Sequence, residues 1–115
     1  MRISKSVMPH PGAEPQYVYV FVRTDIPLAN QMAQMGHACI GAGREFGISG
    51  EYIVVLQVPN ERALLHAVDR ADAAGVKAFL FHEPDPPVVG YNAACTEPVK
   101  GRKRGCFRRF RLWGS

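Results

Sequence analysis

The sequence predicts a three-layer α/β sandwich, in which helices flank a small mixed sheet of four strands. Runs of apolar and β-branched residues typical of strands alternate with segments that show helical periodicity. The order along the chain is strand, helix, strand, helix, strand, loop, strand. The chain has 115 residues, of which 47% are hydrophobic and 21% charged, as is usual for one globular domain.

The first strand and the first helix are expected at residues 17–22 and 28–46. The letters YVYVFV form a continuous β-branched and aromatic run, which favours a strand buried on both faces. Pro27 stands where the start of a helix tolerates proline. At about 100° per residue, the helix separates into two faces. The face expected in the core holds Leu28, Met32, Met35, Cys39, Ala42 and Phe46, and the opposite, polar face holds Asn30, Gln34, His37, Gly41 and Arg44.

A second strand and a second helix follow. Residues 52–58, YIVVLQV, have strand character, and Asn60 is the expected N-cap of a helix over residues 61–74. Gly75 supplies the C-terminal stop of that helix. Its buried stripe is expected to hold Leu64, Ala67, Val68 and Ala71, which leaves His66 on the solvent side.

The last third of the chain adds two further strands and an edge. Residues 76–81, VKAFLF, are the expected third strand. The segment 82–90 contains three prolines and is therefore expected to be a loop. Residues 91–99 then return as a fourth strand, and residues 108–113 are expected to add an edge strand. At the other end of the chain, the proline-containing residues 1–15 are expected to form an N-terminal arm.

The basic residues are unevenly distributed. Residues 1–99 hold seven Lys or Arg and ten Asp or Glu, a balance of −3, whereas residues 100–115 hold seven cations and no acid, a balance of +7. We therefore divide the chain into the arm, an α/β domain over residues 16–99 and a basic C-terminal tail or edge strand. Aromatic residues alternate with the arginines of the tail, which suits base stacking with phosphate contact, or docking of the tail on the domain.

The three cysteines, Cys39, Cys95 and Cys106, are odd in number and show no CxxC spacing, which argues against a disulfide framework. No window resembles a membrane span, and the N-terminal residues have no apolar stretch of signal-peptide length. We therefore expect a cytoplasmic protein that does not enter a membrane.

Three groups of polar residues are candidates for chemistry, and the first lies at the junction between the first strand and the first helix. Asp25, Asn30, Gln34 and His37 combine there a carboxylate, two amides and a histidine. A histidine exchanges protons near neutral pH, and a neighbouring carboxylate or amide fixes its tautomer. The competing interpretation is structural, with Asp25 capping the helix and His37 on a solvated face.

The second group is His82, Glu83 and Asp85 in the proline-rich loop, where a carboxylate can act as a base or orient a water molecule. Its structural alternative is an acidic surface turn. The third group lies in the segment AACTEPV. There Thr96 is a hydrogen-bond donor for an ester or phosphate, and Cys95 is either a nucleophile paired with the histidine of the helix or, as is commoner, a buried structural residue. The histidines and cysteines lack ligand spacing, so we expect no metal and no cofactor.

The strand YVYVFVRTDI and the helical pattern Gln-x-x-His-Ala at Gln34, His37 and Ala38 resemble the type 2 peptidyl-tRNA hydrolases of archaea and eukaryotes. The resemblance extends over residues 17–99 and includes the helical segment PNERALLHAVDRADAAGV. It implies a small mixed sheet flanked by helices. It also implies metal-independent hydrolysis of the ester that joins a peptide to the 3′ end of a tRNA. Asn30 stands where that family has a functional lysine.

The resemblance implies roles for particular residues, with tRNA or another RNA as the partner. The expected catalytic residues are His37, Glu83, Asp85 and Asp25, of which the histidine and one of the two loop carboxylates orient the attacking water. The expected substrate-binding residues are Asn30, Gln34 and Thr96 at the scissile carbonyl or terminal ribose, with Arg102, Lys103 and Arg104 on phosphates. Two alternatives stay open: a non-catalytic RNA-binding module with the same fold, and an amide or ester hydrolase for a small substrate. A homodimer also stays open.

Overall fold

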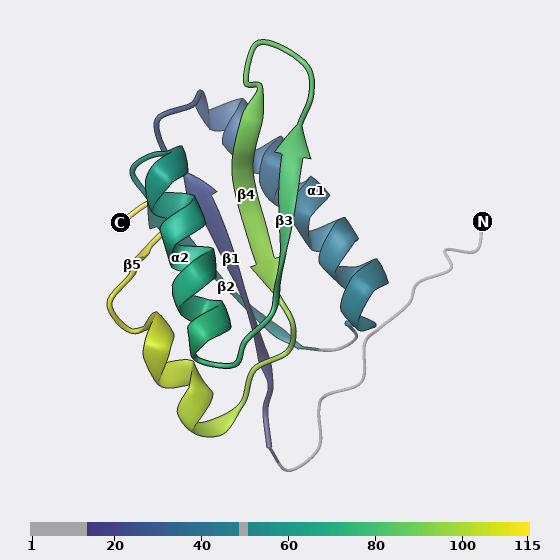
Figure 1. The fold of residues 1–115 in the computed structure, drawn as a ribbon, viewed down its shortest axis with the longest axis vertical. Coiled ribbons are helices and arrows are strands. Elements are labelled where there is room, and N and C mark those ends of the chain that lie inside the picture. Colours follow the sequence, from purple (N-terminus) through teal and green to yellow (C-terminus); the bar gives the residue numbers. More distant parts are fainter. Residues whose placement is uncertain (1–13, 49–50) are drawn as a thin grey trace, which may run out of the picture.

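The computed structural model describes residues 14–48 and 51–115, so residues 1–13 of the expected arm lie outside the described part. A mixed sheet runs through the middle of the domain, with helices on both of its faces (Figure 1). In chain order the elements are β1 (Tyr17–Arg23), α1 (Leu28–Phe46), β2 (Tyr52–Val58), α2 (Glu61–Ala73), β3 (Ala78–Glu83), β4 (Gly90–Thr96), the 3-10 helix η1 (Gly101–Phe107) and β5 (Arg111–Leu112).

The sheet has five strands in the order β3-β4-β1-β2-β5. Strands β1 and β2 are parallel, whereas β4 runs antiparallel to both of its neighbours, β1 and β3. The expected α/β class and mixed sheet are confirmed, and the expected strand number is one too low. The fifth strand is the two-residue β5, which pairs antiparallel with β2. So short a strand has no periodicity of its own. It lies within residues 108–113, where an edge strand was expected in addition to the four.

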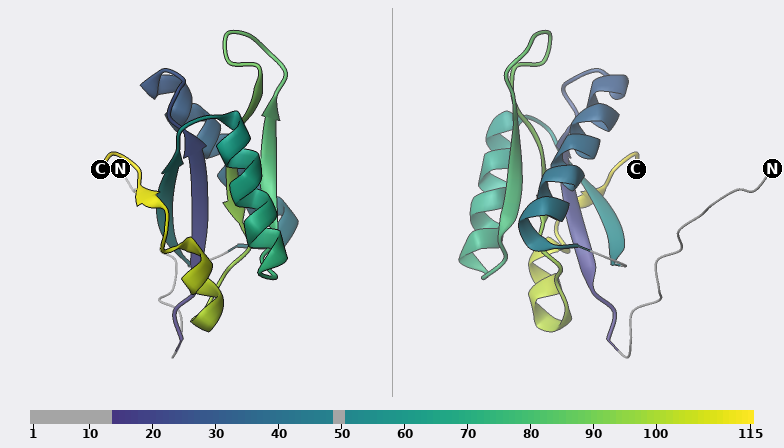
Figure 2. Two further views of the ribbon diagram at one scale, coloured as in Figure 1. Left: turned by 60° about the vertical axis from the view of Figure 1, so that its left-hand side comes forward. Right: turned by 90° about the vertical axis from the view of Figure 1, so that its right-hand side faces the viewer.

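The two helices lie on opposite faces of the sheet (Figure 2). Each face has its own apolar cluster, and β1 contributes to both because its side chains alternate between the faces. Tyr19 and Phe21 belong to the cluster on the α2 side. Val18, Val20 and Val22 belong to the cluster on the α1 side. The expectation of a first strand buried on both faces is therefore confirmed.

Helix α1 has the expected bounds, and four residues of the expected core face, Met35, Cys39, Ala42 and Phe46, pack in the α1-side cluster, but the first part of that face does not. Leu28 and Met32 are 61% and 58% exposed, whereas Gln34, expected on the polar face, is only 2% exposed. Gly41, also assigned to the polar face, packs against the ring of Phe79 on β3, where a Cβ atom would collide with that ring. Relative to the expected core face, the buried face of α1 is thus rotated toward the amide side chains of Gln31 and Gln34. A periodicity argument misses this rotation because it treats every polar residue as solvent-facing.

Several boundaries also differ from those expected from sequence. Helix α2 ends at Ala73, and its N-cap Asn60 accepts a 2.8 Å hydrogen bond from the backbone N–H of Ala63, as expected for an N-cap. Strand β3 begins at Ala78 rather than at residue 76 and continues to Glu83, inside the segment expected to be a loop. Pairing with β4 extends the strand, and the prolines begin only after Glu83.

Strand β4 is also shorter than expected, and the C-terminal segment folds differently from the expected edge strand. Strand β4 ends at Thr96 rather than at residue 99, and Val99 forms only an isolated bridge with Tyr17. The expected edge strand over residues 108–113 is reduced to β5, and η1 precedes it. No helix in the described part of the chain has the length and apolar character needed to cross a bilayer.

The C-terminal segment, residues 100–115, is folded against the domain. Phe107 is 3% exposed, and its ring stacks on Tyr19 with a centroid distance of 3.9 Å. At the far end of the segment, Trp113 Nε1 donates a 2.8 Å hydrogen bond to Gln31 Oε1 on α1. The aromatic residues of this segment are therefore anchors, and the docking alternative is correct for them.

Candidate functional site

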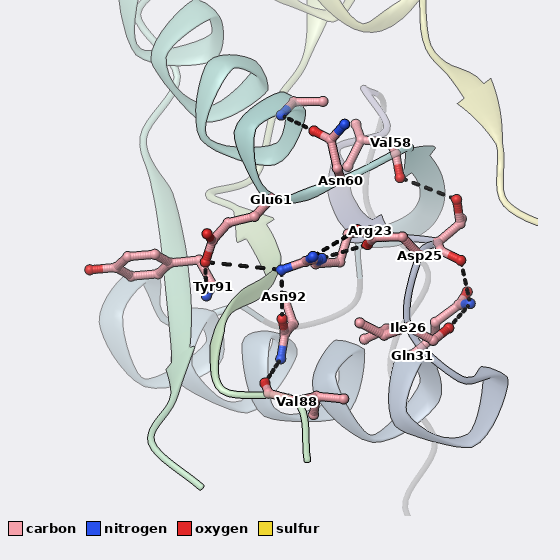
Figure 3. Close-up of polar contacts among 12 residues, drawn as sticks. Arg23, Asp25, Ile26, Gln31, Val58, Asn60, Glu61, Val88, Tyr91 and Asn92 are labelled. Carbon is pink, nitrogen blue, oxygen red and sulfur yellow. Dashed lines mark hydrogen bonds and ion pairs between the residues drawn. The ribbon is translucent and has the colours of Figure 1, made fainter. Parts of the chain in front are cut away.

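The candidate site begins where β1 ends. Arg23, the last residue of the strand, forms a two-bond ion pair with Asp25, with Nε–Oδ1 and Nη2–Oδ2 distances of 2.6 and 2.7 Å (Figure 3). The hydrogen bonds from the Arg23 guanidinium hold the pKa of the Asp25 carboxyl below its usual value. Asp25 is therefore an ionised partner of Arg23, and the helix cap proposed as its structural role is absent from the described hydrogen bonds of α1.

A bulge in β4 brings a second polar side chain to this place. Phe81 pairs with Ala93, but the next residue of β3, His82, pairs with Tyr91, so Asn92 is the extra residue. Tyr91 packs against the α2-side cluster and Ala93 belongs to the α1-side cluster. The bulge thus resets the alternation of side chains along β4. As a result Asn92, which is fully buried, reaches helix α1.

Asn92 connects β1 to α1 through hydrogen bonds. Its Oδ1 accepts from Arg23 Nη1 at 3.4 Å, while its Nδ2 donates to Gln34 Oε1 at 3.2 Å and to the Val88 carbonyl at 2.6 Å. Gln34 Nε2 in turn donates to Glu83 Oε1 at 2.9 Å. We call the five linked side chains of Asp25, Arg23, Asn92, Gln34 and Glu83 the polar chain.

Helix α2 supports the polar chain from the other side. Its first residue, Glu61, accepts a 2.8 Å hydrogen bond at Oε2 from the backbone N–H of Tyr91 and lies 4.0 Å from Arg23 Nη1 (Figure 3). Gly90 has φ +126°, and a Cβ atom there would collide with the Glu61 carboxylate. Glycine at this position therefore lets the carboxylate approach the start of β4 and hold it.

His37 lies on the same sheet face as Gln34 and Glu83 of the polar chain. It is exposed on α1 one turn after Gln34, and its ring stacks on Phe81 with a centroid distance of 4.7 Å and an interplanar angle of 13°. Phe81 precedes Glu83 by two residues and so projects to the same side of β3. Stacking thus holds the imidazole over β3, on the sheet face toward which Glu83 also projects. Among the described residues, no hydrogen bond joins His37 to Glu83 or to Asp85.

The two loop carboxylates differ in their surroundings. Glu83 is half-buried, and its Oε2 accepts a hydrogen bond of 3.4 Å from the backbone N–H of Asp85. Asp85 is exposed, and its side chain makes no hydrogen bond to a described residue. Of the two carboxylates left open by the sequence, Glu83 is therefore the one that the protein holds in place.

Two other expected site residues, Thr96 and Asn30, do not join the polar chain. Thr96 is fully buried, and its Oγ1 accepts a 3.0 Å hydrogen bond from the backbone N–H of Tyr19. It follows Cys95, which points to the α1 side, so Thr96 points to the opposite face. Asn30 is half-buried in the first turn of α1, and its side chain makes no hydrogen bond within the described residues.

Two cysteines meet beneath α1. The Cys95 thiol, buried in β4, donates to the Thr96 carbonyl at 3.7 Å and lies against Cys39 on α1. The interaction of the two thiols lowers the pKa of Cys39 to about 7 and raises the pKa of Cys95. This contact gives Cys95 a partner other than His37. No three His, Cys, Asp or Glu side chains in the described ranges gather as metal ligands.

The basic residues Arg102, Lys103 and Arg104 lie on η1, which packs on the sheet face that carries α2 (Figure 2). Lys103 Nζ donates to the Gly75 carbonyl at 3.2 Å, and Arg104 Nε donates to the Tyr19 hydroxyl at 2.9 Å. The structure therefore does not bring these cations together with His37, which is on the other face.

A cavity of about 360 Å³ lies between η1, β5 and the adjoining strands. It combines an apolar floor with two guanidinium groups, from Arg104 and Arg108. The lining residues are Tyr19, Val54, Leu56, Gly101, Arg104, Phe107, Arg108, Phe110 and Leu112. No acidic residue is among them, so the cavity suits an anion that has an apolar or aromatic part.

Sequence reasoning missed Arg23, Glu61 and Asn92. A signal was present in two cases, because Arg23 ends an apolar strand and Asn92 interrupts one, and such positions are seldom polar without a partner. Glu61 follows an N-cap, where acids are common, so its contact with β4 has no sequence signal.

Comparison with known proteins shows the fold but no family. No family model matches the chain, and no curated protein matches it. Among solved structures, a protein of unknown function from Agrobacterium tumefaciens is similar, with a TM-score of 0.64 and 12% sequence identity. The similarity covers 84% of this chain and 96% of that one. At this identity the comparison shows a shared fold alone.

Proposed function

We propose that this chain hydrolyses the ester at a tRNA 3′ end by metal-independent attack of water, as a divergent relative of the type 2 peptidyl-tRNA hydrolases. The observation that carries the proposal is the placement of Glu83. Gln34 holds this carboxylate by a 2.9 Å hydrogen bond, one helical turn from the exposed ring of His37. A fixed carboxylate beside an accessible imidazole is an arrangement that can orient and deprotonate a water molecule.

The residues divide into those that touch the substrate and those that position them. His37 and Glu83 orient the water, and one of them accepts its proton as the oxygen attacks the ester carbonyl. The bond to the ribose oxygen then breaks, and that oxygen takes up a proton as the tRNA leaves. Gln34 is a positioning residue, because its amide N–H is occupied by Glu83 and its oxygen by Asn92. Asn30, with no described hydrogen bond, is free to bind the carbonyl or ribose.

The test is hydrolysis of N-acetylated aminoacyl-tRNA, measured as release of the acylated amino acid. We expect turnover by the wild-type protein and a loss of about 100-fold or more in His37→Ala and Glu83→Gln, the size typical of removing a general base. His66→Ala is the matched control, since His66 is an exposed histidine on α2. A wild-type protein that releases no more product than buffer overturns the proposal, as does an unchanged rate in His37→Ala.

A second candidate, RNA binding without catalysis, is favoured by the C-terminal segment. All of its cations except the half-buried Arg104 are exposed, and within the described residues none forms an ion pair with an acid. Two of them, Arg104 and Arg108, flank the cavity with aromatic walls. Guanidinium groups next to aromatic side chains suit phosphate contact with base stacking on single-stranded RNA.

Salt dependence tests this second candidate. We expect affinity for a single-stranded RNA oligonucleotide to fall with salt, and Arg108→Gln to reduce the slope of log K against log salt by about 0.7. Arg44→Gln, an exposed arginine on α1, is the control. An affinity that salt does not change would exclude phosphate contact by this segment.

A further inference from the structure

Strand β3 is an edge of the sheet, and its outer side pairs with no strand of the described chain. The edge lies between the two helices, with α1 against one face of β3 and α2 near the other (Figure 2, right). The exposed edge of a strand carries backbone N–H and C=O groups that another chain can pair with. Ala78–Phe81 are half-buried despite the two helices.

Proline and charged residues, which commonly protect an edge, are absent from the first four residues of β3, Ala78–Phe81. The bulge at this place adds its extra residue, Asn92, to β4 and not to β3. The first part of β3 is therefore a regular strand whose outer side is open for pairing.

A cavity of about 520 Å³ follows this edge, and we call it the β3 slot. Its floor is the start of β3, and its walls come from the end of α1 and the second half of α2. The lining residues are Glu45, Phe46, Val68, Asp69, Asp72, Lys77, Ala78, Phe79 and Leu80. The slot therefore offers apolar contacts on both sides of a pairing edge.

The charge of the slot is negative. Its lining has three acids, Glu45, Asp69 and Asp72, and one cation, Lys77, which gives 1 − 3 = −2. All three acids are exposed, and none forms an ion pair with a described residue. A partner that pairs with β3 would bring its own side chains close to these carboxylates, which favours lysine and arginine.

We propose that the β3 slot binds an extended basic segment of another protein, which adds to the sheet as a sixth strand next to β3. Backbone hydrogen bonds to β3 supply the attachment, apolar side chains of the segment pack against Phe46 and Val68, and its cations meet the acidic rim. This surface differs from both sites considered above, because it involves neither His37 nor the C-terminal segment. Its test is independent of theirs.

The probe is a short fluorescein-labelled peptide in which lysine alternates with valine, titrated with the full-length protein and followed by fluorescence anisotropy. We expect saturable binding that Asp69→Lys weakens by about fivefold or more, because the substitution places a like charge beside the peptide. Glu14→Lys, which makes the same charge change at an exposed residue outside the slot, is expected to leave binding within about twofold of wild type.

Two further peptides separate strand pairing from charge attraction alone. A peptide with glutamate in place of lysine, and a lysine peptide N-methylated at alternate residues, are both expected to lose binding. Hydrogen exchange is expected to slow at the amides of Ala78–Phe81 when the unmethylated peptide is added. Equal binding of the methylated peptide overturns the proposal. So does protection located at η1 or α1 alone, or sedimentation showing that a second copy of this chain occupies the edge in place of the peptide.

Discussion

Each face of the sheet has an apolar cluster, but the two faces differ in where their polar groups lie. On the α1 face the interior contains amides and a carboxylate, joined by the hydrogen bonds of the polar chain. On the α2 face the interior is apolar and aromatic apart from the buried Thr96, and the cations of η1 and of the residues after it are exposed except Arg104, which bonds to the Tyr19 hydroxyl. On the α1 face the polar groups are joined to one another by hydrogen bonds inside the protein. On the α2 face most of the charged groups are exposed to solvent.

This difference bears on the two proposed functions. A buried amide such as Gln34 is tolerated only when its donors and acceptors are satisfied, so the polar chain holds its members in one arrangement. That suits chemistry, which needs a carboxylate in a fixed place. Exposed arginines held by buried aromatic residues keep their freedom, and that suits attraction of a polyanion. The following substitutions test the contrast, from the largest expected effect to the smallest.

Phe107→Ala tests whether the C-terminal segment is part of the core. Phe107 is buried and stacks on Tyr19, so we expect the free energy of unfolding to fall by about 3–5 kcal/mol. Urea denaturation measures it. Leu112→Ala, at an exposed residue of the same segment, is expected to change it by less than about 0.5 kcal/mol. Equal small losses in both variants would show that the segment is a loosely attached tail.

Gln34→Leu tests the polar chain. The substitution removes one hydrogen-bond partner from the Glu83 carboxylate and one from Asn92, so we expect a loss of about 2 kcal/mol, although the new side chain is apolar. Met32→Ala, on the same helix, removes an apolar side chain but is expected to cost less than about 0.5 kcal/mol, because Met32 is exposed. If thermal denaturation showed a larger loss of stability for Met32→Ala than for Gln34→Leu, the orientation of α1 expected from sequence would be supported instead.

A pair of glycine substitutions tests the rotation of α1 more directly. Gly41→Ala places a methyl group against the Phe79 ring, and we expect a loss of about 1–3 kcal/mol. Gly36→Ala meets no neighbouring atom within 4 Å, and alanine is the better helix former, so we expect a gain of about 0.5–1 kcal/mol. Opposite signs in chemical denaturation support the rotation. A gain in both variants would contradict it.

Asp25→Asn tests the exposed end of the polar chain and should have the smallest effect. Since Arg23 lowers the pKa of the folded Asp25 carboxyl, the ion pair contributes stability above the unfolded pKa and loses it as pH falls through the folded pKa. Both side chains reach solvent, so we expect a deficit in the variant of less than about 1 kcal/mol near pH 7. The deficit should disappear toward pH 2 in urea denaturation at several pH values. A deficit that is independent of pH would contradict the ion pair as its cause.

The regular elements of this protein were predictable because their signals are local. The bounds of α1 and β2 were obtained from residues 28–46 and 52–58, since strand composition and helical periodicity depend on near neighbours. His37 was found as the exposed histidine at the strand–helix junction for the same reason. The candidate site was predictable only in part. Glu83 and Asp85 could not be separated, because their sequence surroundings are alike and only Glu83 meets Gln34.

The sequence by itself determined the α/β class, the order of the elements and the basic character of the C-terminal segment. The tertiary structure alone decided that Gln34 and Gly41 of α1 pack on the sheet while Leu28 and Met32 do not, that a bulge turns Asn92 toward that helix, and that the η1 cations lie apart from His37. The physical reason is the same in each case. A polar side chain is buried when partners distant in the chain satisfy its hydrogen bonds, and those partners come together only on folding.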